Sequence, residues 1–352
     1  MTFSHKRVPS LANMLIFYNE TIKEVKFHKH LGITLNCKLN WTDHINAITT
    51  ACMKRVNTLK YFKLKLPRKT LHTIYITMIR SLVDYGIVLF SGQSAALMKN
   101  LERIQYQSAL IITGAIKNTS YARLLVELGW QRIEDRACFM KVSLFYKALN
   151  GLLPPYMSNL IVNKCTRDLI GVRLRRPLAL IPPFYRTDHG LNSFIPSACR
   201  LWNDLPAPLR QSTSLTSFKS NYKKLYVLCG TKGTSLGSRR LDIIHTRFRL
   251  NFTTLNSDLF ERSIIDSPLC RCMQEPETYY HYFINCPTYN VSRIILFNAM
   301  RRIFDDAGLS LDAFPMELIL NHIINGFQED FTRYNIQLFA VVQNYIASTN
   351  RF

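Results

Sequence analysis

Three cysteines and one histidine have the residue types and the spacing of a metal-ligand set. Cys270, Cys272, His281 and Cys286 form the pattern Cys-x-Cys-x8-His-x4-Cys. Thiolate sulfur and imidazole nitrogen are ligands that Zn²⁺ prefers, and four protein ligands with no open position make a structural site rather than a catalytic one. The pattern therefore predicts structural zinc, and the alternative is four residues that only pack or pair.

The two halves of this pattern need different backbone conformations. In an extended segment residues two apart point the same way, so Cys270 and Cys272 can face one ion. Residues five apart on an α-helix lie about 140° from a common face, so His281 and Cys286 need a turn or a helix start between them. The His-x4-Cys half is similar to retroviral-type zinc knuckles, whereas the front half is one residue tighter than theirs.

The charge balance points to a second kind of chemistry. The 352 residues carry 45 Lys and Arg against 23 Asp and Glu, a net charge of +22. Residues 1–80 hold fourteen of the basic residues and three acidic ones. Such a balance favours phosphate-rich partners, and the alternative is a basic pI without a ligand. We expect RNA, DNA or an RNA–DNA hybrid as the partner.

A basic face is expected on the first long helix. From Trp41 the apolar residues step by three and four, from Ile45 to Leu66, and Pro67 ends the pattern. Opposite this stripe, and just beyond it, lie the candidate phosphate contacts, unless they are simply solvated: Lys54, Arg55, Lys60, Lys63, Lys65, Arg68 and Lys69.

A second basic strip is rich in arginine, proline and aromatic residues. Arg173, Arg175 and Arg176 precede Pro177, and Phe184 and Tyr185 follow. Arginine beside aromatic rings in an extended segment suits single-stranded nucleic acid, and the alternative is a basic surface loop.

Nine cysteines and an N-terminus without an apolar signal region predict an intracellular protein of the nucleus or cytoplasm. The best membrane candidate, residues 74–90, is interrupted by Arg80 and Asp84, so we expect a buried helix and no membrane partner. The sequence does not indicate an oligomeric state.

The periodicity predicts a mainly α protein with a short N-terminal β-hairpin and one further strand over residues 14–36. Helices are expected over about 41–66, 68–90, 94–113 and 131–150, with Gly114 ending the third. The boundaries drawn from these patterns are 1–38 for the strands, 39–160 for a helical bundle, 161–229 for the Arg/Pro-rich strip and helices, 230–238 for a linker, and 239–352 for a small helical domain with the Cys/His cluster.

The order of several short phrases resembles one family, the reverse transcriptases of non-LTR (LINE-type) retrotransposons. Over about 250 residues they run His30-Leu31-Gly32-Ile33-Thr34-Leu35, Leu39-Asn40-Trp41, Asp84-Tyr85-Gly86, Ile104-Gln105, Ile112-Thr113-Gly114-Ala115, Glu127-Leu128-Gly129-Trp130, Tyr146-Lys147, Asn150-Gly151, Pro155-Tyr156, Ser193-Phe194-Ile195-Pro196, Trp202-Asn203 and Phe218-Lys219.

The resemblance implies a place in a hand-shaped polymerase. His30 to Leu35 looks like the strand that steadies the primer end where palm meets thumb, so residues 1–38 would be a palm remnant and 39–160 a thumb-like bundle. The family's catalytic signature, an aromatic, one residue and two aspartates, would precede His30, yet no aspartate lies before it. Those aspartates hold Mg²⁺, so we expect magnesium only in a full-length enzyme and no polymerase activity from this chain alone.

Phe304-Asp305-Asp306 only superficially echoes that signature, because it lacks the intervening residue and ends an expected helix. The leading hypothesis is a fragment of an RNA-directed DNA polymerase that grips template–primer. The alternatives are a non-enzymatic module that binds nucleic acid or protein, and a decayed reading frame. Paired aspartates encoded in frame upstream of Met1 would favour the enzyme.

Overall fold

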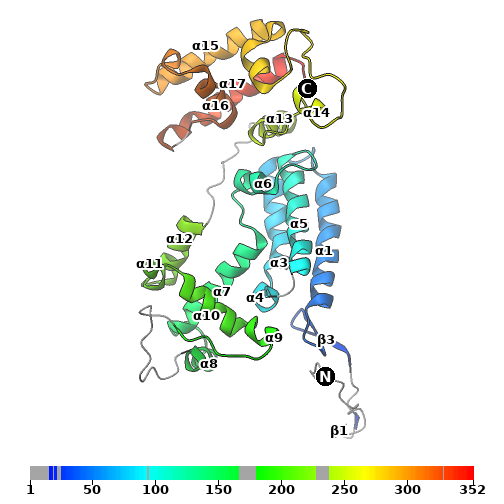
Figure 1. Ribbon diagram of the computed structural model, residues 1–352, viewed down its shortest axis with the longest axis vertical. Coiled ribbons are helices and arrows are strands. Elements are labelled where there is room, and N and C mark those ends of the chain that lie inside the picture. The colour runs from blue at the N-terminus through cyan, green and yellow to red at the C-terminus, as the bar shows by residue number, and fades with distance from the viewer. Residues whose placement is uncertain are drawn as a thin grey trace. The chain divides into compact units, whose positions relative to one another are not determined.

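Helices make up most of the described chain, as the periodicity predicts. The computed structural model describes residues 16–18, 20–21, 25–92, 95–165, 180–226, 238–327 and 329–352. Within these ranges the named strands are confined to the N-terminal part, and the rest is helix and connecting turns (Figure 1). The predicted fold class is therefore confirmed at this level.

The N-terminal strands form two short hairpins. β1 (Ile16–Phe17) pairs with β2 (Glu20–Thr21), and β3 (Phe27–His30) pairs antiparallel with β4 (Ile33–Asn36). Leu31 and Gly32 join β3 to β4 with φ of 45° and 82°. Positive φ at both central residues is typical of the tight turn whose twist matches the strands. The prediction of one hairpin and one further strand was therefore one strand short.

The first long helix, α1 (Thr42–Tyr61), buries the apolar stripe that the sequence predicts. Ile45, Cys52 and Leu59 are at most 1% exposed. The helix ends six residues before Pro67, and backbone hydrogen bonds from Phe62 to Leu66 continue it as turns.

The expected second helix is divided into shorter pieces. α2 (Arg68–Ile74) passes into a π-helical segment, η1 (Tyr75–Arg80), and then α3 (Ser81–Asp84). Gly86, with φ of 72°, separates α3 from α4 (Ile87–Phe90). Wider π turns change which residues face inward. Helical spacing over residues 68–90 predicts an interior face of Leu71, Ile74, Met78, Leu82 and Tyr85. This prediction is wrong at Met78 and Tyr85, which are exposed, while Tyr75 and Ile79 are buried.

Contacts between Cα atoms divide the chain into two units, each made of three separate segments. Unit 1 comprises residues 1–56, 77–105 and 131–228, and unit 2 comprises residues 57–76, 106–130 and 229–352. The boundaries drawn from sequence cut the chain into consecutive pieces, whereas each unit gathers segments that lie far apart in it.

Unit 1 has its own aromatic core around Trp202. The Trp202 indole packs against the rings of Phe145, Tyr146 and Phe218, whose centroids lie 5.9 to 6.2 Å from it. The core is built by α7 (Ile133–Leu149), α8 (Pro155–Cys165), α10 (Phe194–Asp204), α11 (Ala207–Arg210) and α12 (Leu215–Tyr226). Short α9 (Asp188–Leu191) precedes α10.

Unit 2 holds the Cys/His cluster within a second, largely helical core. α13 (Arg239–Arg249) and α14 (Asn256–Phe260) lead into the loop that carries the ligands. After it, α15 (Asn290–Asp306), α16 (Met316–Asn325) and α17 (Asn335–Ser348) pack together (Figure 1). α6 (Tyr121–Leu128) and the C-terminal half of α5 (Ala95–Thr113) also belong to this unit.

Among the described residues, no helix combines the length and the hydropathy needed to cross a bilayer.

Candidate metal centre

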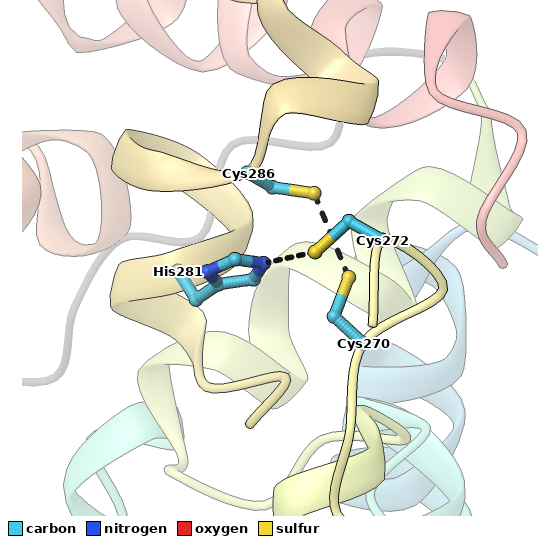
Figure 2. A group of neighbouring side chains, drawn as sticks. All are labelled: Cys270, Cys272, His281 and Cys286. Carbon is cyan, nitrogen blue, oxygen red and sulfur yellow. Dashed lines mark hydrogen bonds between the residues drawn. The ribbon is translucent and has the colours of Figure 1, made fainter. Parts of the chain in front are cut away.

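The four predicted ligands converge on one point in unit 2. The Sγ atoms of Cys270, Cys272 and Cys286 and a ring nitrogen of His281 all lie within 4.8 Å of one another. The Cys270 and Cys286 sulfurs are 3.5 Å apart, and the Cys272 sulfur is 3.3 Å from His281 Nε2. Figure 2 shows the four side chains pointing toward one another from a loop and from the helical segment that follows it.

These separations match the edges of a tetrahedral ligand shell. With metal–sulfur and metal–nitrogen bonds of about 2.3 and 2.0 Å, tetrahedral zinc ligands lie about 3.5 to 3.8 Å apart. The Cys270–Cys286 and Cys272–His281 separations fall at or just below these lengths, and the other ligand pairs lie within 4.8 Å. The cluster can therefore hold a metal ion, and three sulfurs with one nitrogen form a donor set that suits zinc.

A tight turn presents the two front cysteines. Leu269 bridges to Pro276, the Cys270 N–H donates to the Glu275 carbonyl, and the Met273 N–H donates to the Cys270 carbonyl. Met273 takes a φ of 62° to complete this turn. Cys270 and Cys272 both face the cluster, but from a turn, so the expectation of an extended segment is wrong at Arg271 and Cys272.

A π turn brings His281 and Cys286, the second half of the ligand pattern, to the same side. The segment His281–Asn285 (η2) is π-helical, and the Cys286 N–H donates to the His281 carbonyl over 2.8 Å. A bond between residues five apart widens the turn, so His281 and Cys286 lie on the same side of it. The expectation of a turn between these two residues is confirmed, and the kind of turn is a feature that spacing alone does not predict.

Packing fixes the π turn from behind. The Tyr282 and Phe283 rings lie against Phe248, with centroids 5.8 and 5.0 Å away, and both are fully buried. The Tyr345 hydroxyl donates to the Tyr282 carbonyl over 2.6 Å. The ligands on this turn are therefore positioned by the core of unit 2.

Glu275 orients the histidine, and no motif or spacing predicts this role. His281 Nδ1 lies 2.8 Å from Glu275 Oε2, which leaves Nε2 directed at the cluster. The hydrogen bond from His281 lowers the pKa of Glu275. A carboxylate on the second ring nitrogen fixes the orientation of a metal-binding imidazole and strengthens it as a ligand.

The two front thiols sit in opposite environments. Burial raises the pKa of Cys270 to about 12. A backbone hydrogen bond from Gln274 lowers the pKa of Cys272 to about 7. A bound cation favours the thiolate at both positions, because metal ligation requires deprotonated sulfur.

A buried ion pair anchors the loop that carries the cluster. Glu277, fully buried, accepts hydrogen bonds from Arg351 Nε at 2.6 Å and Nη2 at 2.5 Å. The Asn256 N–H donates to the same carboxylate over 2.8 Å. Three chain segments are thereby held together beside the metal ligands.

The predicted basic face separates into exposed and interior residues. Lys54, Lys60, Lys65 and Lys69 are exposed, whereas Lys63 is half-buried. The Arg55 guanidinium donates to the Met78 carbonyl. Lys65 Nζ lies 3.7 Å over the ring of Tyr61, which is 66% exposed, so a cation and an aromatic surface face solvent together.

Arg68 is not part of that exposed face. It is buried, and its Nη1 lies 2.6 Å from Glu127 Oε1, while Arg249 contacts the same carboxylate. Burial alone would raise the pKa of Glu127, but the Arg249 and Arg68 guanidiniums outweigh burial and lower the pKa to about 2. Arg68 therefore compensates a buried charge, and its predicted role in phosphate contact is not supported by this position.

The other sequence-based candidates are placed as follows. Arg173, Arg175 and Arg176 lie outside the described residues. Asp305 and Asp306 are exposed at the end of α15, so the interpretation of this pair as a solvated helix end is confirmed.

Comparison with known proteins adds no relative, because no protein-family model, no curated protein and no solved structure matches the chain.

Proposed function

We propose that this chain is a nucleic-acid-binding piece of a non-LTR retrotransposon reverse transcriptase, which grips template–primer through phosphates while other parts of the protein polymerise. The observation that carries the proposal is the set of exposed lysines at the end of α1 and just beyond it, Lys60, Lys65 and Lys69. Lysine contacts to phosphates give affinity without reading bases.

Two of the segments that carry the family resemblance contact each other. The Tyr85 hydroxyl of the Asp84-Tyr85-Gly86 phrase donates to the Leu31 carbonyl over 2.6 Å. A Cβ at Gly86 would lie 2.6 Å from Ile33 Cδ1, so glycine permits this close approach to the β3–β4 hairpin. The two phrases thus form one packed structure, which supports reading them as parts of one motif.

The test is binding to a fluorescent RNA–DNA hybrid at several salt concentrations. For the full chain, log affinity should fall linearly with log salt. Replacing Lys60, Lys65 and Lys69 with glutamine preserves helix propensity and should flatten that slope by about 2 to 3 if all three touch phosphate.

The matched control replaces three other exposed lysines, Lys99, Lys223 and Lys224, with glutamine, which changes the net charge equally. An equal loss of slope in both triple variants would mean that only net charge matters. An unchanged slope in the Lys60/Lys65/Lys69 variant would place the binding surface elsewhere.

For the Cys/His cluster we propose zinc, bound structurally. Protein purified without chelator should contain one equivalent of zinc by elemental mass spectrometry, and Cys286→Ser should remove it. Cys37→Ser, at a half-buried cysteine outside the cluster, is the control and should keep the metal. Folded protein with less than about a tenth of an equivalent would exclude the site.

A further inference from the structure

A basic pocket in unit 2 stands apart from the metal centre. It has a volume of about 340 Å³ and is lined by Lys63, Leu64, Arg240, Ile243, Ile244, Arg247, Thr254 and Phe352. Three of these residues are cationic and none is acidic. This volume lies at the small end of ligand pockets, large enough for a nucleotide-sized group.

Neighbouring structure holds the arginines in place. Arg240 donates to an oxygen of Phe352, the last residue, whose terminal carboxylate offsets part of the Arg240 charge. Arg247 Nε donates to the Gly114 carbonyl over 3.1 Å. This carbonyl orients the Arg247 guanidinium but does not cancel its charge, and each guanidinium has five N–H donors.

The nearby carboxylates are already engaged. Asp242 accepts a hydrogen bond from Gln343, and Glu127 pairs with Arg68 and Arg249. Among the described residues, none of the ion pairs involves Lys63, Arg240 or Arg247. Burial lowers the pKa of Lys63, and the charges of Arg247, Arg239 and Lys60 lower it further. An anion in the pocket would relieve this repulsion.

Apart from Thr254, the rest of the wall is apolar. Ile243 and Ile244 of α13 line it together with Leu64 and Phe352. The Phe352 ring is held against Phe248 and Tyr282 at centroid distances of 5.8 and 5.6 Å. A ligand that combines a phosphate with a flat or apolar body therefore matches this lining better than a bare inorganic anion.

We propose that the pocket binds one phosphate and the adjoining nucleoside of a single nucleic-acid strand, with Lys63, Arg240 and Arg247 around the phosphate. The inference rests on the proposed function, and it adds a defined subsite next to the exposed lysines. Lys63, which lines the pocket, lies in the chain between the exposed Lys60 and Lys65.

The experiment measures binding of a fluorescent 20-nucleotide polyuridine RNA to the full chain and its variants. Lys63→Gln with Arg240→Gln should weaken binding at least about tenfold at 0.1 M salt and flatten the salt slope by about 0.7, since single strands lose about 0.7 per phosphate contacted and the pocket holds one phosphate. Arg240→Lys should restore part of the affinity. Lys99→Gln with Arg302→Gln, at two exposed residues, changes the net charge equally and should bind like the parent.

A second arm titrates uridine monophosphate and inorganic phosphate against the same proteins by calorimetry. The nucleotide should bind more tightly than phosphate, and the double variant should lose both. If the double variant binds RNA and nucleotide like the parent, the pocket is not the binding site, even if the Lys60/Lys65/Lys69 variant loses RNA binding. If uridine monophosphate binds and no nucleic acid does, the pocket stands as a free-nucleotide site and the proposed function fails.

Discussion

Glu275 illustrates how much of the metal centre depends on a residue that does not touch the metal. Its carboxylate is about half exposed, yet it contacts the buried His281 ring at 2.8 Å. Glu275→Gln keeps a hydrogen-bond acceptor but removes the charge, so zinc affinity should fall about tenfold while the one-to-one stoichiometry remains. Competition with a chromophoric chelator measures the affinity. Glu261→Gln, at an exposed glutamate of the same unit, should leave it unchanged.

His245 should make unit 2 sensitive to mild acid. Burial lowers its pKa to about 3, and Arg249 contributes, against smaller opposing effects of Glu127 and two backbone carbonyls. Its Nε2 lies 3.1 Å from the carbonyl oxygens of Ile323 and Ile324, so the neutral ring donates there. Between its unfolded pKa of 6.5 and about 3, the unfolded chain holds a proton that the folded chain does not. The free energy of unfolding therefore falls as the pH drops below 6.5, by about 1.4 kcal/mol per unit.

Chemical denaturation at pH 7.5, 6.5 and 5.5 in excess zinc checks this expectation. His245→Gln keeps a donor for the carbonyls and removes the titrating group, so its stability should change less with pH than that of the parent. Parallel pH profiles for the two proteins would show that His245 is not the origin of the acid sensitivity.

At the scale of elements, Gly114 at the end of α5 lies in close contact with α13. Gly114 has φ of 73°, and a Cβ there would lie 2.3 Å from Ile243 Cγ1 on α13. Gly308 has the same φ with nothing within 4 Å of such a Cβ. Gly308→Ala should therefore cost about 1 kcal/mol from backbone strain, whereas Gly114→Ala should cost an additional 1 to 3 kcal/mol, approximately, from overpacking. Equal shifts in the denaturation midpoint would mean that α13 moves aside without cost.

The elements also show which features a sequence can predict. The stripe Ile45, Cys52 and Leu59 obeys a regular helical period, so the first long helix and its buried face could be predicted. The next helix could not, because the π-helical segment Tyr75–Arg80 shifts the face without any signal in the apolar pattern. The ligand set of the metal centre was evident from spacing, but the π turn, Glu275 and the Glu277–Arg351 pair depend on tertiary contacts.

At the scale of the whole molecule, the metal should stabilise one unit and not the other. Cys270 and Cys286 are fully buried within the core of unit 2, so removing the ion leaves close-packed thiols and a ring nitrogen without their shared partner. Chelation should therefore lower amide-exchange protection around residues 253–290 at least about tenfold, equivalent to about 1.4 kcal/mol.

The helix α7 in unit 1 provides the internal control for this exchange experiment, and its protection should not change. Readdition of zinc should restore protection in unit 2, whereas magnesium should not, because thiolates are poor ligands for hard cations. A uniform loss of protection over both units would mean that the chelator acts on the chain as a whole.

The discontinuous build of unit 2 has a consequence for the order in which the chain is made. Arg239 donates to the Ile112 carbonyl at the end of α5, and 127 residues separate the two. At about 5 to 20 residues per second, a ribosome needs roughly 6 to 25 s to cover that distance. During this time the carbonyls at the end of α5 lack the hydrogen bonds from Arg239, and Gly114 lacks its contact with Ile243. A ribosome that stalls before α13 is made would thus display residues 106–130 as an incompletely packed intermediate, the kind that chaperones protect from aggregation.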